Sequence, residues 1–116
     1  MSIDLSGCCI LIVEDEPLIT MEIAAALESA RALVCTAATL QKALRLAEEP
    51  GLALAIIDLA LGRETTLSVC NRLAERSLPF VIYSGYSEIP PDCKPQAVLC
   101  KPADRETILR TVAALV

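Results

Sequence analysis

The sequence contains no histidine and no tryptophan, and aromatic residues make up only 3% of its 116 positions. The core must therefore be built from Leu, Ile, Val and Ala, which suits helices packed on parallel strands that are buried on both faces. Hydrophobic residues reach 54% of the chain, enough for a sizeable core, so an intrinsically disordered protein is excluded.

The ten Lys and Arg residues are scattered and are outnumbered by fifteen acidic residues, which gives a net charge of −5. This distribution lacks the basic patch that a nucleic-acid partner requires. No run approaches the roughly 18 apolar residues of a membrane span, and Met1–Asp4 lacks the basic region of a signal peptide. We therefore expect a cytoplasmic protein in which residues 1–116 form one domain, with no nucleic-acid or membrane partner.

The six cysteines lack the closely spaced ligand pairs of a zinc site. Cys8, Cys9, Cys35 and Cys100 lie within apolar runs, where cysteine behaves as a small hydrophobic residue. We expect buried, reduced thiols at these positions. Cys93 lies in a polar loop and is the thiol for which we expect reactivity.

Five short apolar runs alternate with segments of helical periodicity. The runs are Cys8–Val13, Ala32–Cys35, Leu52–Ile57, Phe80–Tyr83 and Ala97–Cys100. Each is nearly continuous and of strand length, as expected for strands that are covered on both sides. Helix starts are predicted at four places, marked by Pro17, by Thr39, by Thr65 or Thr66, and by Asp104.

This alternation predicts an α/β fold, namely a flavodoxin-like, doubly wound sheet of five parallel strands in the order 2-1-3-4-5. The segment before the last strand, residues 85–96, contains Pro90, Pro91 and Pro95. Because a proline inside a helix costs about 3 kcal/mol, we expect the fourth helix to be short or irregular.

Polar residues follow four of the five apolar runs. The first run is followed by Glu14, Asp15 and Glu16, the third by Asp58, the fourth by Ser84 and the fifth by Lys101. The carboxyl ends of parallel strands meet at one edge of the sheet, where ligands bind. Clustered carboxylates without histidine favour a hard cation, and Mg²⁺ is the ion that we expect. A carboxylate nucleophile, a divalent ion, a lysine and a hydroxyl together suit in-line phosphoryl transfer to an aspartate.

The motifs Ile12–Glu16, Ile56–Leu59, Tyr83–Tyr86 and Cys100–Pro102 end these predicted strands in order. Together they resemble the response-regulator receiver domain of two-component signalling systems over essentially the whole chain. Asp58–Gly62 and Leu78–Tyr86 are also similar to a bacterial group of single-domain receivers with a Phe-Ala-Thr-Gly-hydrophobic type motif.

The resemblance implies a role for each site residue. Asp58 would be the phosphoacceptor, and it would hold Mg²⁺ together with Glu14, Asp15 and the backbone carbonyl of Ala60. Single-domain receivers of this group would act in phosphorelays, and Mg²⁺ would be their cofactor.

The resemblance also implies that Ser84 binds the phosphoryl group and that Lys101 pairs with a phosphoryl oxygen, with a cis Lys101–Pro102 peptide. A sensor histidine kinase or phosphotransfer protein would donate the phosphoryl group, and a downstream protein would read the result. The chain would catalyse only its own phosphorylation and dephosphorylation, so we do not expect an enzyme with a separate substrate. A homodimer through an apolar face of the first or last helix is a further expected partner.

Two features depart from the receiver pattern. Val98 stands where ordinary receivers carry an aromatic residue, and the fourth helix, which belongs to their usual output surface, is barely present. The match to the single-domain group is partial, since Tyr83–Ser84 stands where that group has Ala-Thr. Tyr86 is open between surface packing and a gate over the site.

Two rival functions remain open. One is a pseudo-receiver that binds proteins without turning over phosphate. The other is an aspartate-dependent phosphatase, which needs a general acid just beyond its nucleophile, whereas Ala60 stands two residues after Asp58.

Overall fold

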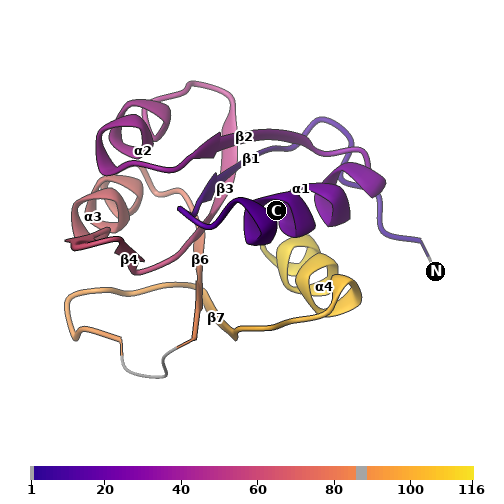
Figure 1. Ribbon diagram of the computed structural model, residues 1–116. Helices are drawn as coiled ribbons and strands as arrows, with labels where there is room; N and C mark the ends of the chain where they lie inside the picture. Colours follow the sequence, from indigo (N-terminus) through magenta and orange to yellow (C-terminus); the bar gives the residue numbers. More distant parts are fainter. Residues whose placement is uncertain (1, 86–88) are drawn as a thin grey trace.

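A five-stranded parallel sheet forms the centre of the computed structural model, which describes residues 2–85 and 89–116 (Figure 1). The strands are β1 (Cys9–Val13), β2 (Leu33–Ala37), β3 (Leu52–Ile57), β6 (Phe80–Ser84) and β7 (Ala97–Cys100). Their order across the sheet is β2-β1-β3-β6-β7, which confirms the predicted order 2-1-3-4-5. The second strand runs on through Ala37, two residues beyond its apolar run, because it stays paired with β1 to the end of that strand.

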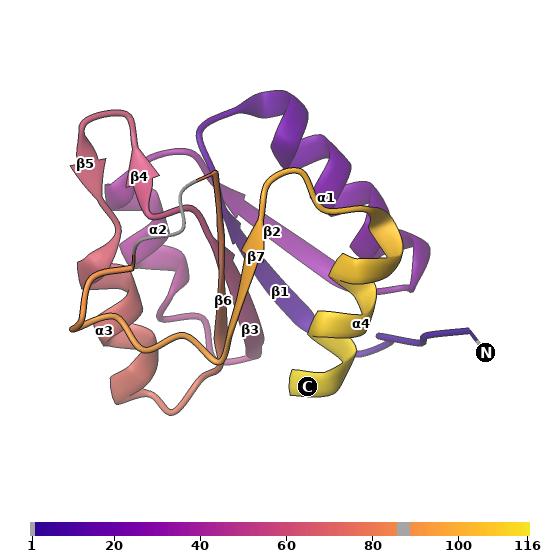
Figure 2. The ribbon, with the colours of Figure 1, turned by 90° about the horizontal axis from the view of Figure 1, so that it is seen from below.

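In the described parts of the chain, four helices cover the sheet, two on each face. They are α1 (Pro17–Ser29), α2 (Leu40–Leu46), α3 (Leu67–Glu75) and α4 (Arg105–Leu115). Figure 2 shows α1 and α4 on one side of the strands and α2 and α3 on the other. None of the helices in the described parts of the chain is both long and apolar enough to cross a membrane.

Alternate residues of the central strands fill two separate halves of the core. Leu11 and Val13 belong to the half that packs against α2 and α3, whereas Ile10 and Ile12 belong to the half beneath α1 and α4. All four side chains are at most 1% exposed. The strands are thus buried on both faces, as their continuous apolar runs predicted.

Most of the predicted helix starts are confirmed. Pro17 is the first residue of α1, and Thr39 and Asp104 cap α2 and α4 by accepting a backbone N–H three residues on, at 3.2 and 2.8 Å. Thr66 occupies the N-cap position of α3, but its side chain makes no capping hydrogen bond. Thr65, the other candidate, lies in a strand instead.

A short hairpin follows β3 and was not predicted. It pairs β4 (Ala60–Leu61) with β5 (Glu64–Thr65) and turns through Gly62, whose φ of 59° favours glycine. Strands of two residues are too short to show a periodicity in the sequence.

The connection from β6 to β7 is irregular in its described residues, 85 and 89–96, which contain no helix. The prediction of a short or irregular fourth helix agrees with this. Tyr86, for which surface packing and a gate over the site were both open, lies outside the described residues.

Most of the expectations for the cysteines are wrong. Cys8, Cys9 and Cys35 are only partly buried, because the outer parts of β1 and β2 are incompletely covered. Cys93 is only 6% exposed, because its loop packs onto the core half beneath α2 and α3, where its thiol contacts that of Cys70. Burial raises the pKa of Cys93, so a reactive thiolate is disfavoured there. Cys100 is exposed because it lies on β7, an edge strand of the sheet.

Candidate functional site

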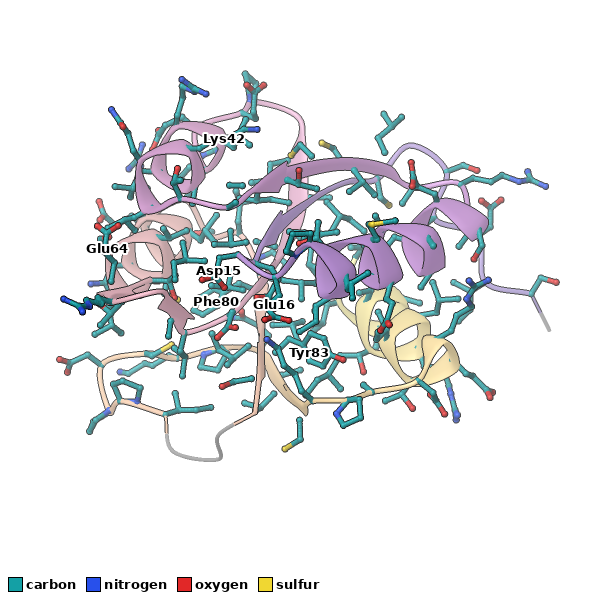
Figure 3. All side chains as sticks on the ribbon, in the orientation of Figure 1. Asp15, Glu16, Lys42, Glu64, Phe80 and Tyr83 are labelled. Atoms are coloured by element: carbon teal, nitrogen blue, oxygen red, sulfur yellow. The ribbon has the colours of Figure 1, made fainter. Side chains whose placement is uncertain are left out.

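The strand register brings the predicted site residues to one edge of the sheet. Val13 pairs with Ile57, so the next residues, Glu14 and Asp58, emerge side by side. The backbone N–H of Asp58 donates to the Val13 carbonyl at 2.9 Å, which continues the ladder by one bond. Figure 3 shows the labelled neighbours of these residues, Asp15 and Glu16, close to the ends of the central strands.

Ser84 and Lys101 reach the same edge at the ends of β6 and β7. Ser84 ends β6 opposite Cys100, and its carbonyl accepts the backbone N–H of Lys101 at 2.9 Å. The Ser84 side chain is buried, at 2% exposure. Lys101 is joined to Pro102 by a cis peptide, as the resemblance implied.

Among the described residues, Asp58 accepts one hydrogen bond on each carboxylate oxygen. Its Oδ1 accepts the backbone N–H of Ala60 at 3.1 Å, and its Oδ2 accepts the Lys101 ammonium at 2.7 Å. The side chain is 15% exposed, so it can be reached from solvent. Since each carboxylate oxygen has two lone pairs, both oxygens keep one for a cation or a phosphorus atom.

Glu14 is the buried member of the acid cluster, at 3% exposure. Its Oε1 accepts the Lys101 ammonium at 2.6 Å, and its Oε2 accepts the backbone N–H groups of Asp15 and Glu16 at 3.1 and 3.2 Å. Burial raises the pKa of the Glu14 carboxyl, and the hydrogen bonds from Lys101 and Glu16 offset part of that rise. Lys101 is therefore the main counter-charge for Glu14.

Lys101 stays charged in this setting. Burial alone would lower the pKa of its ammonium, but the hydrogen bonds to Asp58 and Glu14 outweigh burial and raise the pKa above its usual value. The Nζ atom also lies 5.7 Å from the centre of the Tyr83 ring, within cation–π range. The Tyr83 hydroxyl in turn accepts the backbone N–H of Ala103 at 2.9 Å, which ties the chain after Lys101 to β6.

Asp15 is the exposed member of the cluster. One of its oxygens, Oδ2, accepts the backbone N–H of Gly62 at 2.9 Å, so the tip of the β4–β5 hairpin reaches across to it. Carboxylate oxygens of Glu14, Asp15 and Asp58 lie within 4.8 Å of one another. Opposite ligands of Mg²⁺ lie about 4.2 Å apart, because each bond is about 2.1 Å long. The three carboxylates therefore suit this ion in chemistry, and their spacing is close to the one that it requires.

Three residues near the site were missed by the sequence reasoning. Gly62 and Tyr83 make the contacts just described, and the Thr66 hydroxyl donates to the Asp58 carbonyl at 2.8 Å. A lone glycine soon after the predicted nucleophile was the only sequence signal for the hairpin turn. No sequence signal indicated the role of Thr66, since a threonine before a helix predicts an ordinary cap.

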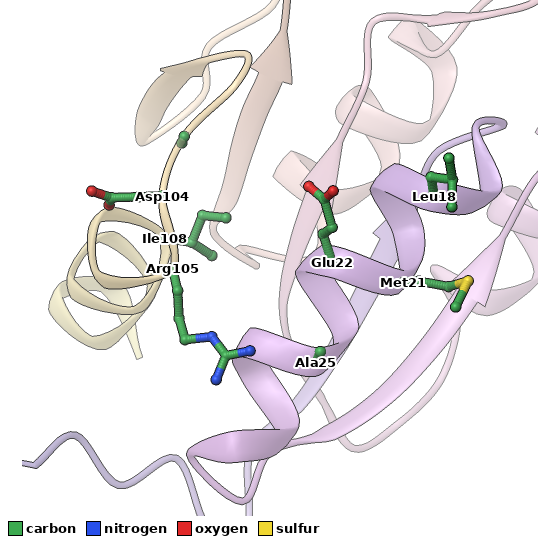
Figure 4. Close-up of a pocket in the computed structure, with 8 residues that line it drawn as sticks. Leu18, Met21, Glu22, Ala25, Asp104, Arg105 and Ile108 are labelled. Atoms are coloured by element: carbon green, nitrogen blue, oxygen red, sulfur yellow. The ribbon is translucent and has the colours of Figure 1, made fainter.

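A hollow of about 460 Å³ opens beside the site, between α1 and α4 (Figure 4). Leu18 and Met21 line its α1 side and are 71% and 64% exposed, and Ala103 lies on its other side, close after Lys101. Met21 also lines a second hollow, of about 260 Å³, together with Glu14 and Asp15 among others. An exposed apolar surface thus begins directly next to the acid cluster.

The family model for "Response regulator receiver domain" matches residues 10–113 of the chain. No curated protein sequence matches the chain significantly. Among solved structures, a CheY-like response regulator receiver domain from Methanospirillum hungatei superposes with a TM-score of 0.84 at 22% identity, covering 94% of this chain and 93% of the other.

Two further solved structures are informative. The response regulator PhyR from Brucella abortus matches with a TM-score of 0.82 at 23% identity, over 97% of this chain and 49% of PhyR. A response regulator from Burkholderia pseudomallei, solved with a phosphorylated aspartic acid, a calcium ion and citrate, has a TM-score of 0.81 at 26% identity, over 94% of this chain and 66% of its own.

Proposed function

Because the chain belongs to the response regulator receiver domain family, we propose that it takes a phosphoryl group onto Asp58 from a phosphohistidine. The donor is a sensor histidine kinase or a phosphotransfer protein. The observation that carries this proposal is the setting of the Asp58 carboxylate, which receives the Lys101 ammonium on one oxygen and the Ala60 N–H on the other.

In the proposed transfer, an Asp58 oxygen forms a bond to phosphorus while the bond from phosphorus to the donor's imidazole nitrogen breaks. The bonding electron pair leaves with the imidazole ring. Lys101, already 2.7 Å from Oδ2, neutralises charge that develops on the phosphoryl oxygens, and the Ala60 N–H orients the attacking carboxylate. Ser84, at the end of β6 beside Lys101, contributes its hydroxyl to a phosphoryl oxygen.

We assign Glu14, Asp15, Asp58 and the Ala60 carbonyl to an Mg²⁺ site. When bound there, this ion would offset the repulsion between the carboxylate and phosphoryl oxygens. The spacing of the three carboxylates supports the assignment, as does the calcium ion reported with the phosphorylated aspartic acid of the Burkholderia pseudomallei protein.

The signal leaves the domain by protein contact or by transfer of the phosphoryl group, and the chain catalyses only its own phosphorylation and dephosphorylation. Val98, which replaces the usual aromatic residue, is 43% exposed on β7. The described residues between β6 and β7 form no helix. Both features argue that the downstream protein uses a different surface from the one that ordinary receivers present.

The decisive experiment incubates the protein with Mg²⁺ and a small acyl phosphate and measures intact mass. We expect one added phosphoryl group, no addition in the presence of a chelator, and saturable Mg²⁺ binding in a separate titration. If neither phosphate nor Mg²⁺ is bound, the chain is a pseudo-receiver. Release of inorganic phosphate from many phosphomonoesters would instead indicate the phosphatase, which Ala60 disfavours because it cannot donate a proton.

Leu18→Asp is expected to slow phosphorylation by a protein donor about tenfold while leaving labelling by the small acyl phosphate unchanged. A protein donor must cover the surface around Asp58, and exposed apolar residues beside the acid cluster are suited to that contact. Aspartate in the first turn of α1 does not cost helix stability, since acids are favoured there. Rates of phosphoryl transfer from a histidine kinase that labels the parent protein measure the effect.

Leu33→Asp is the matched control. Leu33 is 64% exposed but begins β2, at the opposite end of the sheet from the site. Equal rates for the two variants with the kinase would show that the donor does not use α1.

A further inference from the structure

The Thr66 hydroxyl is fully buried and donates to the backbone carbonyl of Asp58 at 2.8 Å. From this contact, and resting on the function proposed above, we infer that Thr66 is a positioning residue, which fixes the backbone of the phosphoacceptor for transfer. Among the hydrogen bonds of the described residues, none joins Thr66 to a carboxylate oxygen of the site. Thr66 therefore acts through the backbone of Asp58 and is not itself catalytic.

The caps of α2 and α4 show how a capping side chain is used elsewhere in this chain, and Thr66 differs from both. Thr39 and Asp104 have extended backbones, with ψ of 154° and 167°, and accept an N–H of the helix that they begin. Thr66 has φ −101° and ψ 15°, and its hydroxyl makes no capping bond to α3. A threonine in the usual capping role would stabilise α3, whereas this one is turned toward the nucleophile.

Thr66 also closes the loop that carries the nucleophile. Its backbone N–H donates to the Leu59 carbonyl at 3.0 Å, and the residue before it pairs with Ala60 in the β4–β5 hairpin. The Ala60 N–H in turn holds Oδ1 of Asp58. The positions of the Asp58 carbonyl and carboxylate are therefore both fixed by hydrogen bonds within the loop from Asp58 to Thr66.

The helix that follows Thr66 holds this loop in place. The Thr66 carbonyl accepts the backbone N–H groups of Val69 and Cys70 in the first turn of α3, and both side chains are at most 1% exposed. Farther along α3, Arg72 binds Glu48 through two hydrogen bonds of 2.6 and 2.7 Å. Thr66 thus joins Asp58 to a helix whose surface is in turn bonded to the turn after α2.

The test compares Thr66→Val, which keeps the side-chain shape and removes the donor, with Thr66→Ser, which keeps the hydroxyl. At saturating Mg²⁺, we expect Thr66→Val to lower the maximal rate of labelling by a small acyl phosphate roughly tenfold. The donor concentration that gives half of that rate should stay unchanged, and Thr66→Ser should restore the rate. A role in folding alone would leave the maximal rate per folded molecule unaltered.

Thr111→Val is the matched control, because the Thr111 hydroxyl also donates to a backbone carbonyl at 2.8 Å, within α4. If Thr66→Val labels as fast as Thr111→Val, the inference is wrong while the proposed function stands. Failure of the parent protein to label would overturn the proposed function itself. Should Thr66→Val not fold, Thr66→Cys offers a weaker donor of similar size and must label more slowly than Thr66→Ser; equal rates would overturn the inference.

Discussion

Asp58→Asn is expected to abolish phosphorylation, with labelling by a small acyl phosphate in Mg²⁺ reduced by at least about 100-fold. The amide that replaces the carboxylate is a far weaker nucleophile and cannot give a stable acyl phosphate. Its carbonyl oxygen can still accept the Ala60 N–H, so the loop should keep its shape. Intact mass and peptide mapping measure the result.

The Asp58→Asn variant should also remain folded, which makes a loss of labelling interpretable. Lys101 loses one partner but keeps Glu14 at 2.6 Å. Burial is the main reason why the pKa of Glu14 is raised, and the Asp58 charge adds a smaller rise, so removing that charge relieves a repulsion within the cluster. Asp92→Asn, a change of the same kind at an exposed residue of the β6–β7 connection, should label like the parent protein. Full labelling of Asp58→Asn, or a phosphoryl group mapped to another residue, would remove Asp58 from the proposal.

The residues at the strand ends could be predicted because two simple patterns determine them. Continuous apolar runs define parallel strands that are buried on both faces, and the polar residue that follows each run must lie at the carboxyl edge. The positions of Asp58 and Lys101 at this edge could be predicted from these two patterns alone. Their ion pair of 2.7 Å joins positions 43 residues apart in the chain.

The remaining parts of the site depend on how segments pack, which local patterns do not encode. Thr66 has the sequence signature of a helix cap, yet the hairpin before it turns its hydroxyl toward Asp58. The cysteines show the same limit. Cys93 is buried because a polar loop folds onto the core, and Cys100 is exposed because its apolar run forms an edge strand.

Lys101→Met is expected to lower the rate of phosphoryl labelling and to raise the affinity for Mg²⁺. Labelling should fall about 100-fold, because the group that neutralises the phosphoryl oxygens is lost from a partly buried site. Mg²⁺ should bind several-fold more tightly, because the ammonium now lies 2.6 and 2.7 Å from two of the proposed ligands and repels the ion. Labelling rates by intact mass and Mg²⁺ titration of the same samples test both effects, with Lys94→Met as the control at an exposed lysine of the β6–β7 connection.

The metal-free Lys101→Met variant should also lose about 2 kcal/mol of unfolding free energy at neutral pH, because Glu14 is left buried without its counter-charge. Burial already raises the pKa of Glu14, and the loss of Lys101 raises it further. A raised carboxyl pKa favours the folded state only while the group is protonated. The deficit relative to the parent protein should therefore be small below pH about 4.5, grow as the pH rises through the Glu14 pKa of the folded variant, and shrink again when Mg²⁺ is added. Denaturant unfolding at several pH values measures this profile, and a deficit independent of both pH and Mg²⁺ would mean that Lys101 contributes packing and not charge.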